Sequence, residues 1–245
     1  MQEDAANLDE VVVVGYGTMD KKELTSAISH VSARNFTQVA SVDPSMMIQG
    51  KVPSVSITNT GAGDPNNQAS IQVRGVSSRA AELGPLIVID GVPGGNLTNI
   101  NPNDIESYDV LKDGAASAIY GTRGSNGVIL VTTKKGARDG NLHTTYNGTV
   151  AFDVIKKELD MLNAAEYRAN RLASGTGYDL GSSTDWMKEV SRVGVRTVHT
   201  LTLSGGNIKS NYRASVDYRD AKGIDKYSGR EEYGARASLS HTTKS

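Results

Sequence analysis

Residues 85–136 constrain the fold most, because they place short apolar strands and one small-residue helix between glycine turns. The stretch opens with Pro85-Leu-Ile-Val-Ile-Asp-Gly-Val-Pro93, and its continuous apolar run at 86–90 is typical of a strand buried on both faces. Residues 115–120 predict a short helix whose small side chains allow close packing on a sheet. Residues 128–133 predict a closing strand, and the charged, glycine-containing run 134–140 predicts a boundary.

The residues before this stretch predict further elements of the same unit. We expect strands around 25–31, 55–58 and 70–74, separated by loops at 61–67 and 76–84. A helix is expected around 43–50, because Asp43 and Pro44 suit an N-cap and a first helical position and Gly50 suits a helix end. The expected unit is a small mixed sheet with short helices, of the α+β class.

The pattern changes after Gly140. Apolar and polar residues alternate along 144–153, 211–219 and 233–240, and less regularly along 195–204. Each segment has about the ~9–11 residues that a tilted membrane strand needs. Arg213 and Arg219 share the polar parity, which keeps both off a lipid-facing side. A soluble antiparallel sheet with one wet face has the same period, so alternation alone leaves both interpretations open.

Composition excludes several classes of function. The chain of 245 residues has 26 basic and 27 acidic residues, a formal net charge of −1, and no basic stripe, so no nucleic-acid partner is expected. Cysteine is absent, which excludes a disulfide framework and a thiolate metal site. Between the alternating segments 144–153 and 195–204, short helices are expected at 163–168 and 185–190.

No constellation for catalysis or metal binding is evident. The histidines are scattered, without the spacing of a metal site: His30, His143, His199 and His241. Asp64, Asn66 and Asn67 could ligate calcium, but they lack the complete loop pattern, and a turn rich in Asx residues is the default. No nucleophile elbow or Ser/His/Asp order is present. We therefore expect no enzyme, no cofactor and no metal.

The run Val11-Val-Val-Val-Gly15-Tyr-Gly17 admits three interpretations. A dinucleotide-binding turn is disfavoured, because Asp20 replaces the third glycine and no acidic strand end follows at the expected distance. A mobile segment could instead add as a strand to the exposed sheet edge of a partner. The valines could also form the first strand of the globular unit.

Several glycines stand at expected strand and helix junctions: Gly75, Gly91, Gly121, Gly124 and Gly127. They could cradle a phosphate, but no Gly-Lys-Ser/Thr element accompanies them, since Val52 follows Gly50-Lys51. Positive φ or close backbone approach in compact turns is the favoured explanation.

The motifs Pro85-Leu-Ile-Val-Ile-Asp-Gly91 and Ala118-Ile-Tyr-Gly-Thr-Arg-Gly-Ser-Asn-Gly-Val-Ile129 closely resemble the plug domain of TonB-dependent outer-membrane receptors, in particular the SusC/RagA-like group. The resemblance implies a flexible leader with a TonB box at 1–20, a plug domain at 21–139 and the first antiparallel strands of a transmembrane β-barrel at 140–245. Related barrels have about 22 strands, so these strands alone imply a fragment with unpaired edges, which we expect to be poorly ordered or aggregation-prone in isolation.

The implied function is import of nutrients, oligosaccharides (glycans) or peptides, across the cell outer membrane, with the leader facing the periplasm. The implied partners are the TonB C-terminal domain, energised through ExbB and ExbD, and a SusD-like lipoprotein. The alternative is a soluble β-rich adhesion or interaction module.

The resemblance also implies roles for individual residues. The TonB box is assigned to Glu10, Val11, Val12, Val13, Val14 and Gly15. The substrate-facing plug positions are Ser77, Ser78, Arg79, Pro93, Gly94, Gly95, Asn96 and Tyr120. Arg74 and Arg123 are expected to form ion pairs between the plug and the barrel wall, the alternative being ordinary solvated arginines.

Overall fold

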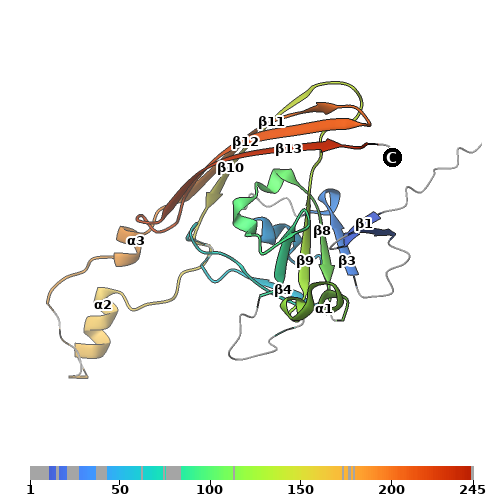
Figure 1. Cartoon of the computed structure of the whole chain (residues 1–245). Coiled ribbons are helices and arrows are strands. Elements are labelled where there is room, and N and C mark those ends of the chain that lie inside the picture. The colour runs from blue at the N-terminus through green and yellow to red at the C-terminus, as the bar shows by residue number, and fades with distance from the viewer. Residues whose placement is uncertain are drawn as a thin grey trace, which may run out of the picture.

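A mixed sheet of five strands, in the order β3-β8-β9-β6-β7, organises the first half of the chain (Figure 1). Its strands are β3 (Ile28–Ser32), β6 (Leu86–Ile89), β7 (Val92–Pro93), β8 (Ile105–Leu111) and β9 (Val128–Thr133). β6 and β9 run parallel, and every other pair of neighbours is antiparallel. We refer to residues 28–133 as the mixed-sheet unit.

The computed structural model describes residues 11–14, 17–20, 28–36, 43–61, 63–73, 75, 84–112, 114–172, 174–175, 178 and 180–243.

Alternate residues of the central strands build a core on each face of this sheet. One face packs Val88, Leu111 and Val128 against Ala116 of helix α1 (Gly114–Tyr120). The other face carries the larger cluster, in which Tyr108 and Ile129 are fully buried. Over it lie the hairpin β4 (Val55–Thr58) with β5 (Ser70–Val73) and the short 3-10 helices η2 (Pro44–Ile48), η3 (Leu97–Asn99) and η4 (Pro102–Asp104). Further short 3-10 helices are η1 (Ala33–Asn35) and η5 (Gly121–Gly124).

These elements confirm most of the sequence-based expectations. The strands at 55–58 and 128–133 have the expected bounds, and β6 and α1 agree within one residue. The helix expected at 43–50 is wrong in type and length, since it is the single 3-10 helix η2. Its cap is as expected: Asp43 accepts a hydrogen bond from the Ser45 amide at 2.9 Å. β3 begins at Ile28, and residues 25–27 lie outside the described part.

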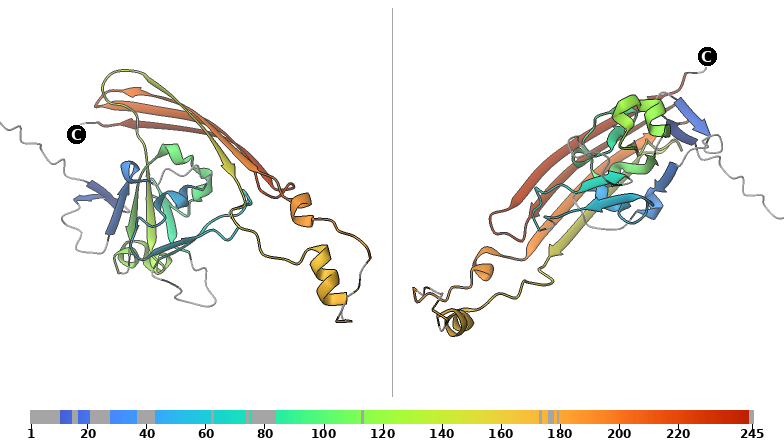
Figure 2. Two further views of the ribbon diagram at one scale, coloured as in Figure 1. Left: turned by 180° about the vertical axis from the view of Figure 1, so that it is seen from behind. Right: turned by 90° about the horizontal axis from the view of Figure 1, so that it is seen from below.

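The second half of the chain forms one long antiparallel sheet of four strands in sequence order. It consists of β10 (His143–Asp153), β11 (Gly194–Gly206), β12 (Ser210–Lys222) and β13 (Gly229–His241). The sheet lies along one side of the mixed-sheet unit in every view (Figures 1 and 2). Among the described residues β10 and β13 have no further neighbour, so the sheet does not close.

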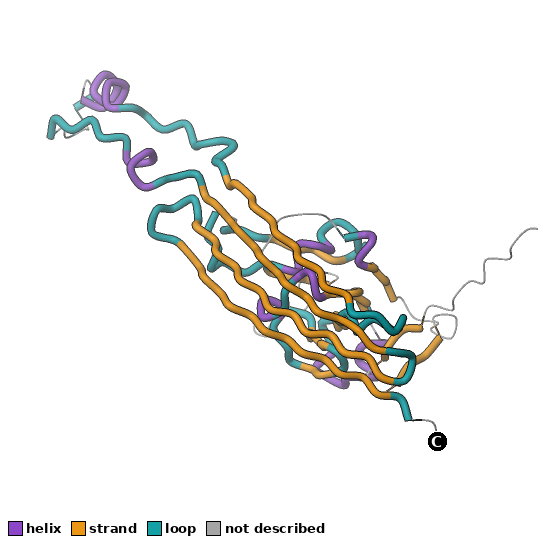
Figure 3. The backbone as a smooth tube through the Cα atoms, turned by 90° about the horizontal axis from the view of Figure 1, so that it is seen from above, coloured by secondary structure: helices purple, strands orange, loops and turns teal. Residues whose placement is uncertain are grey.

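The described residues of the segment 154–193, which we call the arm, extend beyond one end of the long sheet (Figure 3). They carry α2 (Ala164–Tyr167), continued by a π-helical turn (Arg168–Leu172), and α3 (Trp186–Val190). The side chains of Asn163 and Asp185 cap the first amides of α2 and α3, which confirms the helices expected at 163–168 and 185–190. None of the helices that the structure describes is both long and apolar enough to cross a membrane.

The long sheet turns its polar face toward the mixed-sheet unit and its apolar face outward. On the inner face Thr200, Ser215 and Arg219 are at most 5% exposed. On the outer face Val216 is 53% exposed and Phe152 67%. A soluble sheet of this kind buries its apolar face and exposes the polar one. The expected parity of Arg213 and Arg219 is confirmed, and the soluble-sheet interpretation is disfavoured.

The connection between the two halves presses directly on the long sheet at Gly136. A Cβ atom on this residue would lie 2.2 Å from the carbonyl oxygen of Tyr212. Only glycine allows the two backbones to approach this closely. The junction is therefore a packed contact as well as a covalent link.

We expect Tyr108→Phe to lower the free energy of unfolding by about 1 kcal/mol, because it removes the hydrogen bond that the buried Tyr108 hydroxyl donates to the Pro44 carbonyl. The Tyr108 hydroxyl donates to that carbonyl at 2.9 Å, and burial raises the pKa of the phenol. Urea unfolding of the full chain measures the loss. Tyr167→Phe is the control, since its exposed hydroxyl donates to the Tyr178 carbonyl at 3.3 Å. An equal loss in both variants would contradict the assignment.

Candidate functional site

The two halves meet through residues 96–104, which we call the docking segment. Asn96 accepts hydrogen bonds from the amide and hydroxyl of Thr98, at 3.0 and 2.8 Å. Asn101 accepts one from the amide of Asn103 at 2.9 Å. These Asx turns hold η3 and η4 against the inner face of β11 and β12. The segment thus holds its polar groups at fixed positions facing the long sheet.

Asp104 is the centre of this contact. It is 2% exposed, and its carboxylate accepts hydrogen bonds from Arg213 at 2.8 Å and from Ser215 at 2.6 Å. Lys134 joins the cluster through its ammonium, which donates to the Asn103 carbonyl at 2.8 Å. Burial, and then the Arg213 charge, lower the pKa of Lys134, while Asp104 opposes the shift. A buried carboxylate is tolerated here because both oxygens have donors.

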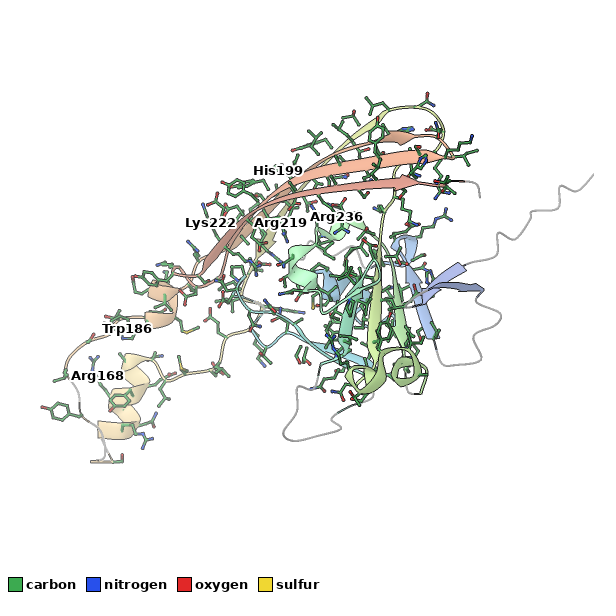
Figure 4. The ribbon with its side chains drawn as sticks, viewed as in Figure 1. Arg168, Trp186, His199, Arg219, Lys222 and Arg236 are labelled. Carbon is green, nitrogen blue, oxygen red and sulfur yellow. The ribbon has the colours of Figure 1, made fainter. Side chains whose placement is uncertain are left out.

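Neighbouring contacts extend the polar interface along the long sheet. The Asn101 amide donates to the Thr200 hydroxyl at 2.8 Å, and both residues are buried. Arg219 donates to the Thr98 carbonyl at 3.3 Å and forms ion pairs with Asp217 and Glu232, each at 3.1 Å. Arg219 and Arg236 lie on the side of the sheet that faces the mixed-sheet unit (Figure 4).

A second, more open ion pair lies at the β6–β7 hairpin. Asp90 and Gly91 have φ of 48° and 85°, as a two-residue type I′ turn requires. The Asp90 carboxylate accepts hydrogen bonds from the amide and hydroxyl of Thr133, at 2.8 and 2.7 Å, and from Arg236 at 2.5 Å. Both charged side chains are 37% exposed, so water screens this pair far more than that of Asp104.

Charges across the described interface run opposite to the pattern expected from Arg74 and Arg123. The acids, Asp90 and Asp104, belong to the mixed-sheet unit, and the arginines belong to the long sheet. Arg123 is exposed, with its guanidinium beside Gly94, and Arg74 lies outside the described residues. Their pairing with a barrel wall stays a prediction. The sequence contained a signal for the observed direction of these ion pairs, because an arginine such as Arg213 on a buried polar face requires an acid opposite.

The expected substrate-facing residues are distributed over several places. Pro93 and Gly94 are exposed, and Gly94 lies beside Arg123, whereas Tyr120 packs at the edge of the core formed with α1. Asn96 is exposed and caps η3, and Gly95 packs beside Ile89. Ser77, Ser78 and Arg79 lie outside the described residues. The role of this set in binding cargo stays a prediction.

Val11–Val14 form β1, which pairs with β2 (Gly17–Asp20) as a separate two-stranded sheet. β1 is thus no part of the five-stranded sheet. Glu10 and Gly15 lie outside the described residues.

Asp64 accepts a hydrogen bond from the Asn66 amide at 2.9 Å, which confirms the expected Asx turn. Among the residues with described positions, no group of three or more His, Asp or Glu side chains could hold a metal ion.

We expect Asp104→Asn to destabilise the full chain by about 3 kcal/mol, because Arg213 then lies largely buried without its counter-charge. Asp90→Asn should cost less than about 1 kcal/mol, because the pair is solvated and asparagine tolerates the positive φ of the turn. Denaturant titration of both variants measures the difference. Equal losses would show that Asp104 is not the principal anchor.

Comparison with known proteins agrees with this architecture. The family model of the TonB-dependent receptor plug domain matches residues 20–128. TonB-dependent receptor SusC of Bacteroides thetaiotaomicron is 38% identical over 98% of this chain and 25% of its own length. A TonB-dependent receptor of Formosa agariphila is 35% identical over 91% of this chain and 22% of its own length. The chain spans about a quarter of the length of these curated relatives.

Solved structures show the same fold. The RagAB peptide importer in its open-open state aligns with a TM-score of 0.85 at 23% identity, over 96% of this chain and 31% of that chain. The siderophore receptor PirA of Acinetobacter baumannii aligns with a TM-score of 0.55 at 17% identity, over 89% and 29% of the two chains. The mixed-sheet unit corresponds to the plug, and the long sheet to part of a barrel. The chain belongs to the SusC/RagA-like family of TonB-dependent receptors.

Proposed function

We propose that this chain forms the plug and the first wall strands of an outer-membrane importer for oligosaccharides or peptides. Residues 1–20 serve as the leader, 21–139 as the plug and 140–245 as the wall. The inverted orientation of the long sheet, polar inside and apolar outside, is the observation that supports this most directly. It suits a wall that encloses a polar plug and faces lipid.

The outer face also has the aromatic pattern of a membrane strand. A row of rings crosses the strands, from Tyr146 through His199 and Tyr218 to Tyr233, with centroids 5.0–6.5 Å apart. On β12 the apolar positions end at Tyr218, and charged residues follow toward the arm. Tyrosine at the border between apolar and charged surface is typical of the membrane–water interface. The arm then lies on the external side and the leader on the periplasmic side.

In the proposed mechanism the leader alternates between a docked state and a free state. Cargo at the outer side of the plug favours the state in which the leader is free, a population shift between docked and free states. The TonB C-terminal domain, energised through ExbB and ExbD, adds to residues 10–15 as a strand and pulls. The place of β1 outside the five-stranded sheet supports this, because its only described partner is β2.

The family also suggests the remaining partners. A SusD-like lipoprotein closes the outer side of the importer. Peptide cargo is suggested by the name of the RagAB peptide importer, and glycan cargo by the resemblance of the plug motifs to SusC-like importers. A soluble adhesion module is not favoured, because it would expose the broad apolar face to water.

Substitution on the outer face tests the membrane assignment. We expect Val216→Arg to destabilise the receptor in phospholipid vesicles by about 2–4 kcal/mol, since it places a cation in hydrocarbon. The control is Asp220→Arg, which has the same parity on the same strand but lies beyond Tyr218 and opposite Glu231. It should cost less than about 1 kcal/mol. Denaturant-induced unfolding from the vesicles measures both, and equal values would argue against a lipid-facing side.

Proline substitution tests the leader. Val13→Pro removes a backbone donor from the strand that TonB is proposed to bind, so TonB capture and uptake should be lost while cargo binding persists. Thr18→Pro is the matched control, because Thr18 is the cross-strand partner of Val13. It weakens the β1–β2 pair but leaves residues 10–15 able to pair with TonB. Loss of TonB capture in both variants, or in neither, would refute the assignment.

A further inference from the structure

The turn between β12 and β13, residues 223–228, is held by the plug on one side. We call it the rim turn. The Ile224 amide donates to the Gly63 carbonyl at 2.8 Å, and the Asn66 side chain donates to the Gly229 carbonyl at 3.2 Å. A Cβ atom on Gly223 would lie 2.6 Å from the Gly63 carbonyl oxygen, so the two backbones are in close contact. The plug residues involved, 63–67, are called the apical loop.

The arm holds the same turn from its other side. The Ile224 carbonyl accepts a hydrogen bond from the Arg192 amide at 2.7 Å. The Arg192 guanidinium donates to the carbonyls of Gly223 and Ser228, at 2.9 and 2.7 Å. The Lys226 amide donates to the Val190 carbonyl at 2.9 Å, which ties the end of α3 to the turn. In Figure 4 the arm, with Trp186 and Arg168, lies beyond the end of β12 at Lys222.

Ile224 therefore joins both sides through one residue. Its amide bonds to the apical loop and its carbonyl to the arm. A shift of Arg192 that moves this carbonyl also moves the amide on the same Cα atom, since the backbone between them is short and stiff. A polar pocket lined by Asp64, Asn67 and Arg230 opens at the junction. Hydrogen bonds at such an accessible junction break at low cost.

We propose that the rim turn is a relay that couples the position of the arm to the apical loop of the plug. Displacement of the arm weakens the hold on the apical loop, and displacement of the apical loop loosens the end of the arm, as thermodynamic reciprocity requires. The proposal rests on the proposed function only for its direction, with the arm on the external side. In that setting a displacement of the arm on the external side changes the hold on the apical loop of the plug.

Hydrogen–deuterium exchange on the full chain in detergent micelles tests the coupling without a lipid bilayer, cargo or TonB. Arg192→Ala removes the guanidinium contacts, and amide exchange should rise about tenfold in the rim turn and also in the apical loop, where Asp64 and Asn67 donate to Gly61 and Asp64. Arg168→Ala is the matched control, because this arginine of the same arm bonds to the Ser182 carbonyl. It should leave exchange in both segments unchanged.

The reverse experiment starts from the plug. In Gly63→Val the new Cβ would lie 3.2 Å from the Ile224 Cδ1 atom, and exchange of the Arg192 amide should rise. Gly84→Val is its control, since nothing lies within 4 Å of a Cβ atom there. The proposal is overturned if Arg192→Ala affects the rim turn alone, if Gly63→Val leaves the Arg192 amide unchanged, or if exchange rises equally in β8 and β9. The experiment involves neither a lipid bilayer nor uptake. An error in the importer assignment would therefore not by itself produce any of these three overturning outcomes.

Discussion

The contact of Asp104 with Arg213 and Ser215 is the interaction on which the architecture depends. A carboxylate that is 2% exposed must have donors, and β12 supplies both from alternate residues of one face. Because side chains of a strand alternate with a period of two, this contact turns Asn211 and Arg219 inward and Tyr212, Ala214 and Val216 outward. The apolar outer face, and with it the case for a lipid-facing wall, follows from the polar inner one.

A polar interface also suits a plug that moves, as the proposed mechanism requires. Hydrogen bonds that are exchanged for bonds to water change the free energy by only about 0.5–1.5 kcal/mol each, whereas separation of an apolar interface exposes its whole area. The anchors differ in strength: the Asp104 cluster is buried, while Asp90 and Arg236 are solvated. The proposed leader precedes β3, an edge strand of the five-stranded sheet whose first residue, Ile28, pairs with Leu111 at the end of β8 away from Asp104. In the proposed mechanism, force on the leader acts first on this edge strand rather than on the docking segment.

Local pattern was sufficient to predict much of the fold. The apolar run at 86–90 predicts β6, because a strand that is buried on both faces is apolar at every position. The alternation along 211–219 predicts β12, because a strand with one polar and one apolar face alternates with a period of two. The 3-10 helix η2 could not be distinguished from an α-helix, since Asp43, Pro44 and Gly50 suit the ends of either. The partners of the buried side chains were also beyond the sequence. Arg213 lies 109 residues from Asp104, and only the packing of the two sheets brings them together.

Spin-label accessibility along β12 would test the central claim most directly. The chain has no cysteine, so single labels at residues 211–218 have no background. In the receptor reconstituted in lipid vesicles, collision with oxygen should peak at the even positions, including Ala214 and Val216, and fall at the odd positions, where Arg213 and Ser215 face the plug. Peaks at the odd positions, or no period of two, would contradict a wall whose polar face holds the plug and whose apolar face meets lipid.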